Sequence, residues 1–497
     1  MVMLPAADYS TRTPRGPEAQ VTDQSAGGGV DRRVVLFVAA TASFLTPFMA
    51  TSINIALPSI GREFSINAVS LGWVTTAYLL AAAMFLVPLG RIADIRGRRK
   101  VFLAGMVGYT VVSFLCTLSV SESMLIALRA LQGFTDAMMF GTSTAIVTSV
   151  YPPERRGRAL GFIVASVYSG SALGPFIGGF LTQAAGWRSI FWLTTLLGAL
   201  VVALTLWKMR GEWAEARGQR MDVIGSVLYG LGLLGLMYGF RLLPSTAGAV
   251  PLAAGAAFLA AFVFRENRTD SPVLDMSLFR RNVVFALSNL AALINYAATY
   301  ALSFLLSLYL QYIKGLGPRS AGVVMLAQPV MMALFSPLAG RLSDRVEPRI
   351  VASIGMAMSA TGLFLTAFLG VGSPLPLIVA ILVLCGLGFA LFSSPNTSAI
   401  MGSVQRRQYG VASATTGVMR LIGQMLSMGI AALIIALYVG EVQITPLQYP
   451  AFLRAFRVGF LLCAGLCVAG LLASLARGNL RAPSDGKRDA AGSDQVN

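Results

Sequence analysis

Three charged side chains lie deep within long uncharged runs of this 497-residue chain: Asp136 and Arg129 in one run, and Arg420 in another. A carboxylate shielded from water can take up and release a proton, with an affinity set by burial and by nearby guanidinium groups. Arg129 precedes Asp136 by seven residues, so on a helix the two share a face but lie about 10 Å apart along the axis. The pattern indicates either a proton carrier at Asp136 or a permanent ion pair between Asp136 and an arginine of another helix.

Other kinds of chemistry find little support in the sequence. The chain has no His, which removes the usual general base, metal ligand and pH switch. Its cysteines sit in apolar stretches without a CxxC pair, which argues against a zinc site or a disulfide framework. They are Cys116, Cys385, Cys463 and Cys467. No loop is rich in carboxylates, so we expect neither an enzyme nor a bound metal or cofactor.

The composition identifies the setting of these charges. Hydrophobic residues make up 56% of the chain and charged residues 12%, against about 25% charged residues in soluble proteins. Fourteen nearly uncharged runs are long enough to cross about 30 Å of hydrocarbon. They cover residues 34–59, 70–90, 101–120, 124–150, 159–184, 189–207, 223–240, 246–264, 283–310, 320–340, 350–370, 375–401, 410–439 and 456–476. The sequence therefore predicts an all-α polytopic membrane protein.

The net charge of +17 orients the chain rather than indicating a nucleic-acid partner. Most Lys and Arg residues fall on the side of the expected membrane that holds both chain ends, and basic residues favour the cytoplasm. We therefore expect a multi-pass protein of the bacterial inner (plasma) membrane with both termini cytoplasmic. No cleavable signal peptide is expected, because the first 30 residues lack an apolar core. The expected partners are the lipid bilayer and a small-molecule substrate, and a monomer is expected.

Two pairs of cytoplasmic segments repeat along the chain. Residues 90–100 (GRIADIRGRRK), here called the first turn, resemble residues 340–349 (GRLSDRVEPR), the second turn, about 250 residues later. Residues 155–159 (RRGRA) recur as residues 406–412 (RRQYGVA) with nearly the same offset. Chance similarity of Arg-rich loops predicts neither the agreeing offset nor the matched place after each second span. The repeats indicate two parallel halves, as in one large class of secondary transporters.

This repeat sets the expected domain organisation. Two six-helix bundles flank an inserted pair of helices, and the polar ends of the chain are predicted to be disordered. The expected segments are the head 1–33, the N-terminal bundle 34–208, the insertion 209–282, the C-terminal bundle 283–476 and the tail 477–497.

Four sequence elements, in order, resemble motifs of the major facilitator superfamily. The first turn is similar to its signature loop, and residues 129–133 (RALQG) to its RxxQG element. Residues 161–179 match the fifth-span motif of its antiporters, and residues 48–58 (FMATSINIALP) resemble the first-span motif of its fourteen-helix drug:proton antiporter branch. The resemblance covers residues 34–476 and implies the major facilitator fold, with alternating access between its two halves.

The resemblance also implies that the turns latch the halves in one of two states. A carboxylate facing arginines at a half-wet interface forms a pair that can be made and broken. The alternative is a purely topological role for the basic residues. The implied latch residues are Gly90, Asp94, Gly97, Arg98, Arg99, Gly340, Asp344 and Arg345. The second turn departs from the pattern, because Glu347 and Pro348 stand where the glycine is expected.

The fifth-span motif brings several glycines to one helix face. Residues 170, 174 and 178 are spaced by four, which lets another helix approach closely. We expect this helix to slide or bend against a neighbour during transport, the alternative being static packing. The motif residues are Gly161, Gly170, Gly174, Pro175, Gly178 and Gly179.

The coupling site departs from the antiporter branch. Met49 occupies the position in the first span where that branch usually carries an acid. Either Asp136 has taken over proton coupling, or the protein is not proton-coupled in the usual way. Polar residues expected to face a cavity or substrate are Arg129, Gln132, Arg420, Asn54, Asn295, Asn396 and Gln424. Their alternative role is to join helices, as most buried amides in membrane bundles do.

These observations together predict a secondary active transporter. The expected function is export of hydrophobic or amphipathic, drug-like small molecules by alternating access, driven by proton influx. The alternative is a lipid or metabolite exporter, or an uptake carrier, without standard proton coupling. Two buried arginines against one aspartate suit the anionic head group that this alternative requires.

Overall fold

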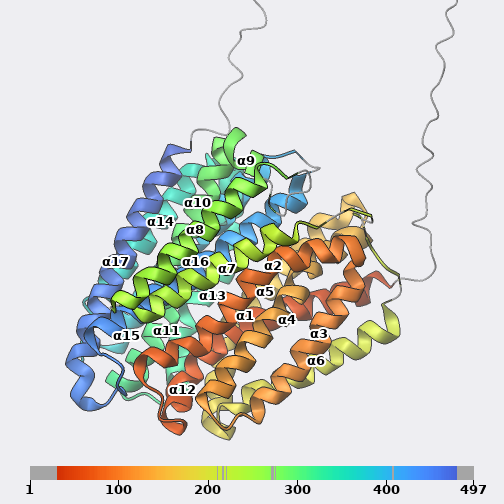
Figure 1. The fold of residues 1–497 in the computed structure, drawn as a ribbon. Helices are drawn as coiled ribbons and strands as arrows, with labels where there is room; N and C mark the ends of the chain where they lie inside the picture. The colour runs from red at the N-terminus through yellow and green to blue at the C-terminus, as the bar shows by residue number, and fades with distance from the viewer. Residues whose placement is uncertain are drawn as a thin grey trace, which may run out of the picture.

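The computed structural model describes residues 31–477 except 210, 215, 217, 220, 244, 270–273, 275, 406 and 407. The described chain is built from long helices (Figure 1). Nearly all of the predicted head and tail, and the Arg406–Arg407 pair of the second repeat, lie outside the described residues.

The helices are described in three groups along the chain, called here the first bundle, the insertion and the second bundle. The first bundle contains α1 (Arg32–Glu63), α2 (Ala68–Arg96), α3 (Arg98–Thr117), α4 (Glu122–Val150), α5 (Pro153–Ala185) and α6 (Arg188–Lys208). The insertion contains α7 (Val223–Leu242), the short η1 (Thr246–Gly248), α8 (Ala249–Glu266) and α9 (Met276–Arg281). The second bundle contains α10 (Val283–Thr299), α11 (Ala301–Leu308), η2 (Tyr309–Ile313), α12 (Pro318–Met325), α13 (Ala327–Arg345), α14 (Pro348–Thr366), α15 (Leu375–Gly402), α16 (Tyr409–Tyr438), η4 (Pro446–Gln448) and α17 (Tyr449–Ala476).

The expected membrane spans are confirmed. Within the described residues, thirteen helical segments are long and apolar enough to cross a membrane. α4 is the other long helix, with 29 residues, and its interior carries Arg129 and Asp136. Charged residues inside a span are costly unless protein covers them, and both side chains are indeed buried.

The ninth and tenth spans are each interrupted. The tenth is split at Leu326 into α12 and α13, and Pro329 lacks the N–H that would bond the carbonyl of Met325. The ninth continues from α10 through α11 into the π-helical turn η2, which holds Gln311. Such π-turns frequently mark functional positions in helices.

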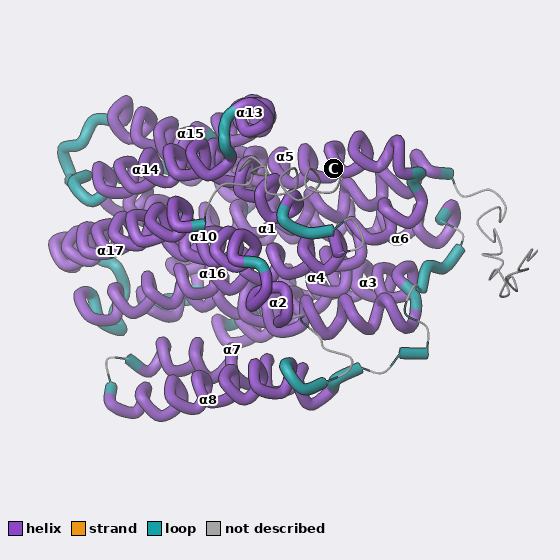
Figure 2. The backbone as a smooth tube through the Cα atoms, turned by 90° about the horizontal axis from the view of Figure 1, so that it is seen from above, coloured by secondary structure: helices purple, strands orange, loops and turns teal. Residues whose placement is uncertain are grey.

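The inserted helices lie at one edge of the molecule (Figure 2). α7 packs against α2 of the first bundle and α16 of the second, and α8 packs on α7. The Tyr229 hydroxyl donates to the carbonyl of Ala83 at 3.1 Å. Further along α7, Met237 and Phe240 lie against Gly429 of α16. The insertion therefore covers a seam between the two halves from the outside.

The two bundles meet at one end of the molecule. We call the end where α1 begins the near end and the opposite end, where α12 lies, the far end (Figure 1). At the far end, Ser307 donates to the carbonyl of Asn54 at 2.7 Å, and the Gln311 amide donates to the carbonyl of Ile55 at 2.9 Å. At the near end, a side chain added at Gly161 or Gly410 would meet no atom within 4 Å. The two halves are therefore hydrogen-bonded to each other at the far end, whereas these two near-end glycines lie at open positions.

The glycines of α5 face α1. A methyl group placed on Gly174 would overlap the Thr51 hydroxyl, and one on Gly178 would overlap Ser52. Ser52 also donates its hydroxyl to the carbonyl of Gly174 at 2.9 Å. The missing side chains therefore allow α1 and α5 to approach closely enough for a hydrogen bond between a side chain and a backbone group.

Gly179 belongs to a different contact. It lies against Pro318 of α12, across the junction between the two halves, and Gly322 of α12 lies against the carbonyl of Pro175. Gly161, in contrast, contacts neither neighbour. The six motif residues of the fifth span are thus divided between a packed face on α1, a contact with the second bundle and one open position.

We predict that Gly174→Leu destabilises the protein, because a side chain at this position overpacks the α1–α5 contact by about 1–3 kcal/mol. The melting temperature of the detergent-solubilised protein should fall, as measured by size-exclusion chromatography after heating. Gly161→Leu is the matched control on the same helix and should melt like the wild type. Equal melting temperatures for the two variants would contradict the close contact.

Candidate functional site

Asp136 lies in the interior of the first bundle, with a relative exposure of 3%. The Thr46 hydroxyl of α1 donates to its carboxylate at 2.5 Å, and Tyr78 of α2 lies beside it. Within the described residues, no basic nitrogen lies within 4 Å of this carboxylate. The structure therefore does not show the permanent ion pair that was the alternative for Asp136.

Arg129 lies about two helical turns before Asp136 on α4. Its Nε donates to the carbonyl of Val74 at 3.1 Å, and one terminal nitrogen donates to Gln132 at 2.5 Å. Its guanidinium also stacks over the ring of Tyr78, 4.4 Å from the centroid. Tyr78 thus lies between Arg129 and Asp136, in keeping with the predicted distance between the two charges.

Arg420 brings a positive charge from the second half. It lies on α16, partly exposed, with its guanidinium 4.7 Å from the centroid of the Phe140 ring on α4. It also interacts electrostatically with Asp136 and with Tyr296 of α10. Asp136 and Arg420, which are far apart in the sequence and lie on different bundles, are therefore close enough to interact electrostatically.

Two of the predicted polar residues join helices. Asn54 donates to the Ser303 hydroxyl at 2.8 Å and accepts from Thr75, so it belongs to the contact between the halves. Gln132 donates to the Ser113 hydroxyl at 2.8 Å and accepts from Arg129, which positions that guanidinium. The substrate role expected for these two side chains has no support in these contacts.

Asn396 is likewise bonded inside the second bundle. It accepts from Arg477 at 2.7 Å and donates to the carbonyl of Ser288 at 3.0 Å. Burial lowers the pKa of Arg477, which follows α17, to about 10, so this arginine stays charged at neutral pH. Asn396 therefore serves to hold a buried cation.

Asn295 and Gln424 differ from these bonded amides. The Asn295 side chain is fully buried, yet neither its amide nitrogen nor its oxygen has a partner among the described residues. Such a group costs free energy unless water or a ligand satisfies it. Gln424 is half-buried on α16, one turn from Arg420.

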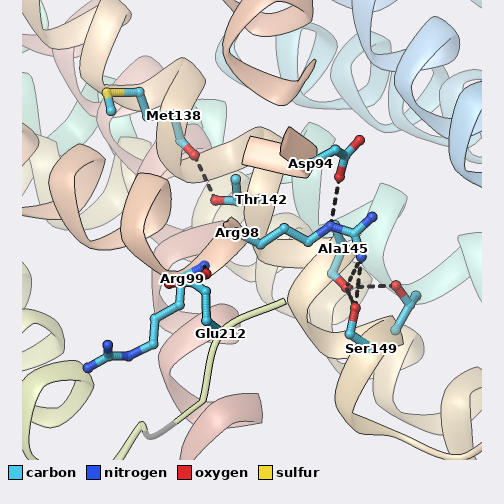
Figure 3. Close-up of polar contacts among 9 residues, drawn as sticks. Asp94, Arg98, Arg99, Met138, Thr142, Ala145, Ser149 and Glu212 are labelled. Carbon is cyan, nitrogen blue, oxygen red and sulfur yellow. Dashed lines mark hydrogen bonds and ion pairs between the residues drawn. The ribbon is translucent and has the colours of Figure 1, made fainter. Parts of the chain in front are cut away.

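The first turn is tightly organised (Figure 3). Arg98 donates from Nε to Asp94 at 2.8 Å and from a terminal nitrogen to the Ser149 hydroxyl of α4 at 2.8 Å. Gly97 links α2 to α3 with φ of 118°, a conformation that residues with a side chain rarely adopt. The Asp94–Arg98 pair expected from the sequence is therefore present, and it joins α2, α3 and α4 of one bundle.

The second turn is built differently. Glu347 precedes α14 with φ of −53°, so this turn does not need a glycine. Asp344 and Arg345 are exposed, Gly340 lies against Ser394 of α15, and Gly90 of the first turn has no atom within 4 Å of an added side chain. The two turns share a sequence pattern but not a backbone geometry.

Several residues of the site were not expected from the sequence. Thr46, Tyr78, Phe140 and Tyr296 surround Asp136 and Arg420. Each is of a type that is common in apolar helices, and only its contact with a charge distinguishes it. One indication of Thr46 was present in the sequence: it precedes Met49, the position expected to carry the acid, by about one helical turn.

The assembled site can bind and move charge without a metal. One carboxylate, supported by a hydroxyl, faces a partly exposed guanidinium on the other bundle, and aromatic rings lie around both. The arrangement suits a cationic or aromatic small molecule, and it suits a proton exchanged at Asp136.

Comparison with known proteins agrees with this architecture. Solved structures with the same fold include a transporter of the POT family in complex with 5-aminolevulinic acid, with a TM-score of 0.68, 16% identity and coverage of 91% of this chain and 97% of that one. Another is a bacterial homologue of the human lysosomal transporter Spinster, captured inward-facing and occupied, with a TM-score of 0.67, 16% identity and coverage of 91% and 97%.

Sequence relatives are transporters as well. The chain is 32% identical to the multidrug resistance protein Stp of Mycobacterium tuberculosis, covering 81% of this chain and 76% of Stp. It is 28% identical to the riboflavin transporter RibZ of Clostridioides difficile, covering 88% and 96%. It is also 28% identical to the tetracenomycin C resistance and export protein of Streptomyces glaucescens, covering 82% and 76%. The family model of the Major Facilitator Superfamily matches residues 39–222 and 289–495, and the chain therefore belongs to this superfamily of transporters.

Proposed function

We propose that this protein is a secondary active exporter of hydrophobic or amphipathic small molecules, driven by proton influx. Two of the relatives above are a multidrug resistance protein and an antibiotic resistance and export protein, which supports export of drug-like compounds. The aromatic rings beside Asp136 and Arg420 support recognition of such compounds, since aromatic side chains bind both flat rings and cations.

The observation that carries the proton coupling is the state of Asp136. It is a buried carboxylate with a hydroxyl donor and, among the described residues, no ion pair. Such a group can exist in both protonation states, whereas a tightly paired carboxylate stays ionised. Arg420 supplies a counter-charge across the gap between the halves. Asp136 is therefore the proton carrier of this proposal, in place of the acid that Met49 replaces.

The same contacts support alternating access. The far-end contacts of Asn54 and Gln311 join the two halves there, and in this proposal the near end is the open side of the present conformation. In the proposed cycle these contacts break when the substrate leaves through the far end. The first turn, in which Asp94 and Arg98 are paired, is proposed to latch the two halves in one of the two states of this cycle.

We further propose that the near end faces the cytoplasm, because basic residues gather on that side. Both termini are then cytoplasmic, and the bacterial inner membrane is the location. A green fluorescent protein fused after residue 497 should fluoresce, because this reporter folds poorly after export. If this fusion is dark and an alkaline phosphatase fusion at the same position is active, the C-terminus lies outside the cytoplasm and the proposed orientation is wrong.

An uptake carrier is the competing candidate. It is favoured by the similarity to RibZ, which is named a riboflavin transporter, since riboflavin is also flat and amphipathic. Riboflavin accumulation by cells that cannot make it would support this candidate.

We predict resistance to several chemical classes when the protein is expressed in a bacterium that lacks its own efflux pumps. Ethidium, a tetracycline and a macrolide form a suitable panel, and cells should also retain less ethidium. Unchanged sensitivity to the whole panel, together with riboflavin accumulation, would replace the export proposal by uptake.

We predict that Asp136→Asn abolishes ethidium efflux driven by a proton gradient in proteoliposomes. The amide keeps the shape of the side chain but cannot release a proton, so ethidium binding, measured by fluorescence, should persist. Glu441→Ala, at an exposed far-end position, is the control and should transport normally. Uphill efflux by Asp136→Asn would show that another group or ion provides the coupling.

A further inference from the structure

The segment between α6 and α7 packs against the first bundle. The described residues between 209 and 219, here called the clip, lie along the first turn. They are Met209, Gly211 to Ala214, Ala216, Gly218 and Gln219. Met209 is buried at 1% relative exposure, and Trp213 packs on the main hydrophobic core. The clip is thus anchored to the first bundle by apolar side chains.

The clip also satisfies backbone groups at the junction of α2 and α3. The first N–H groups and last carbonyl groups of a helix have no partner within the helix. Here the N–H of Arg98 donates to the carbonyl of Trp213 at 2.8 Å, and the N–H of Ala216 donates to the carbonyl of Asp94 at 3.0 Å. One short segment therefore provides hydrogen-bond partners both for the end of α2 and for the start of α3.

Glu212 adds a charged contact at the same place (Figure 3). Its carboxylate accepts from the N–H of Arg99 at 2.9 Å, at the positive end of α3, where an anion is favoured. The same side chain fills the space beside Gly97, so that a side chain at position 97 would overlap it. Gly97 therefore provides both the turn conformation and the room for Glu212.

The clip continues directly into the inserted helices. Gln219 accepts from Arg91 of α2 at 2.7 Å, and Asp222 caps α7 three residues later. Asp222 also forms an ion pair with Arg265 of α8 at 2.8 Å, and its pKa is lowered by this guanidinium and by the Gly225 N–H, which together outweigh its burial. The near ends of α7 and α8 are therefore joined, and the clip fastens them to the first turn.

We propose that the clip positions the first turn for transport, with Glu212 as the positioning residue, and that it makes α7 and α8 move with the first bundle. Glu212 does not touch the region around Asp136. It acts through the backbone of Arg98 and Arg99, whose neighbouring side chains form the Asp94–Arg98 pair. When the halves rock, the contact of α7 with α16 is the one that changes.

Hydrogen exchange of the first turn tests the clip without a substrate. The amides of Arg98 and Arg99 are the first two of α3 and have no acceptor within that helix. Their protection from exchange therefore reports the hydrogen bonds made by the clip. In the purified wild-type protein, a peptide covering residues 97–101 should exchange slowly. The amide of Arg349, at the matching start of α14, has no acceptor among the described residues, and its peptide is the fast internal reference.

Variants of Glu212 then separate its roles. Glu212→Ala should speed exchange at the Arg99 amide by about tenfold, the effect of losing one hydrogen bond to a charged acceptor. Glu212→Gln keeps an acceptor oxygen and should restore most of the protection. Glu441→Ala should leave this exchange unchanged. Fast exchange of residues 97–101 in the wild type, or no change in Glu212→Ala, would overturn the clip.

Transport kinetics test the positioning role. In the proteoliposome assay with ethidium, Glu212→Ala should lower the maximal rate severalfold and leave the apparent KM unchanged, because Glu212 does not contact the substrate region. Glu212→Gln should recover most of the rate. A normal rate in Glu212→Ala, or a change confined to KM, would overturn the positioning role. If the wild type moves no ethidium, the proposed function fails, while the exchange measurement still decides the clip.

Discussion

The structure depends on the cost of placing a charge inside a membrane. A charged side chain at the bilayer centre is unfavourable by several kcal/mol unless protein covers it, and this chain holds three such residues. Arg129 is fully buried, and its partners are a backbone carbonyl and an aromatic ring of α2 and an amide of its own helix, α4. Asp136 is buried beside the hydroxyls of Thr46 and Tyr78, and Arg420 remains partly exposed. The number of partners around each charge thus distinguishes the structural Arg129 from Asp136 and Arg420, which are available for function.

A second constraint is how closely the helices must approach one another. The glycines of α5 allow α1 to come within hydrogen-bonding distance of its backbone, which sets the position of α1 and hence of Thr46 beside Asp136. At the far end, Gly179 and Gly322 do the same for the contact between the bundles. The polar contacts of Asn54 and Gln311 cross this junction with uncharged groups only. Neutral hydrogen bonds of about 0.5–1.5 kcal/mol each hold the halves together without preventing their separation.

The insertion is joined to both halves in different ways. Its near end is fastened to the first turn by backbone hydrogen bonds and by Glu212, and α7 is tied to α2 through Tyr229. Its contact with α16 includes Met237 and Phe240 lying against Gly429, and apolar contacts of this kind can slide more readily than hydrogen-bonded ones. In the proposal above, the extra helices therefore reinforce one half of the transporter and leave the seam between the halves free to change.

Much of this protein could be predicted from local sequence patterns. The apolar runs, the all-α fold and the Asp94–Arg98 pair are all properties of short segments, and the helix is the local structure that satisfies the backbone of such runs in lipid. The separation of Arg129 from Asp136 also followed from helix geometry alone. The partners of each side chain did not follow, because a partner is set by which helix lies opposite, and an apolar helix presents similar faces all round. Only the tertiary structure therefore decided that Asn54 and Asn396 bind other protein groups, that Thr46 and Arg420 face Asp136, and that Glu212 fills the space left by Gly97.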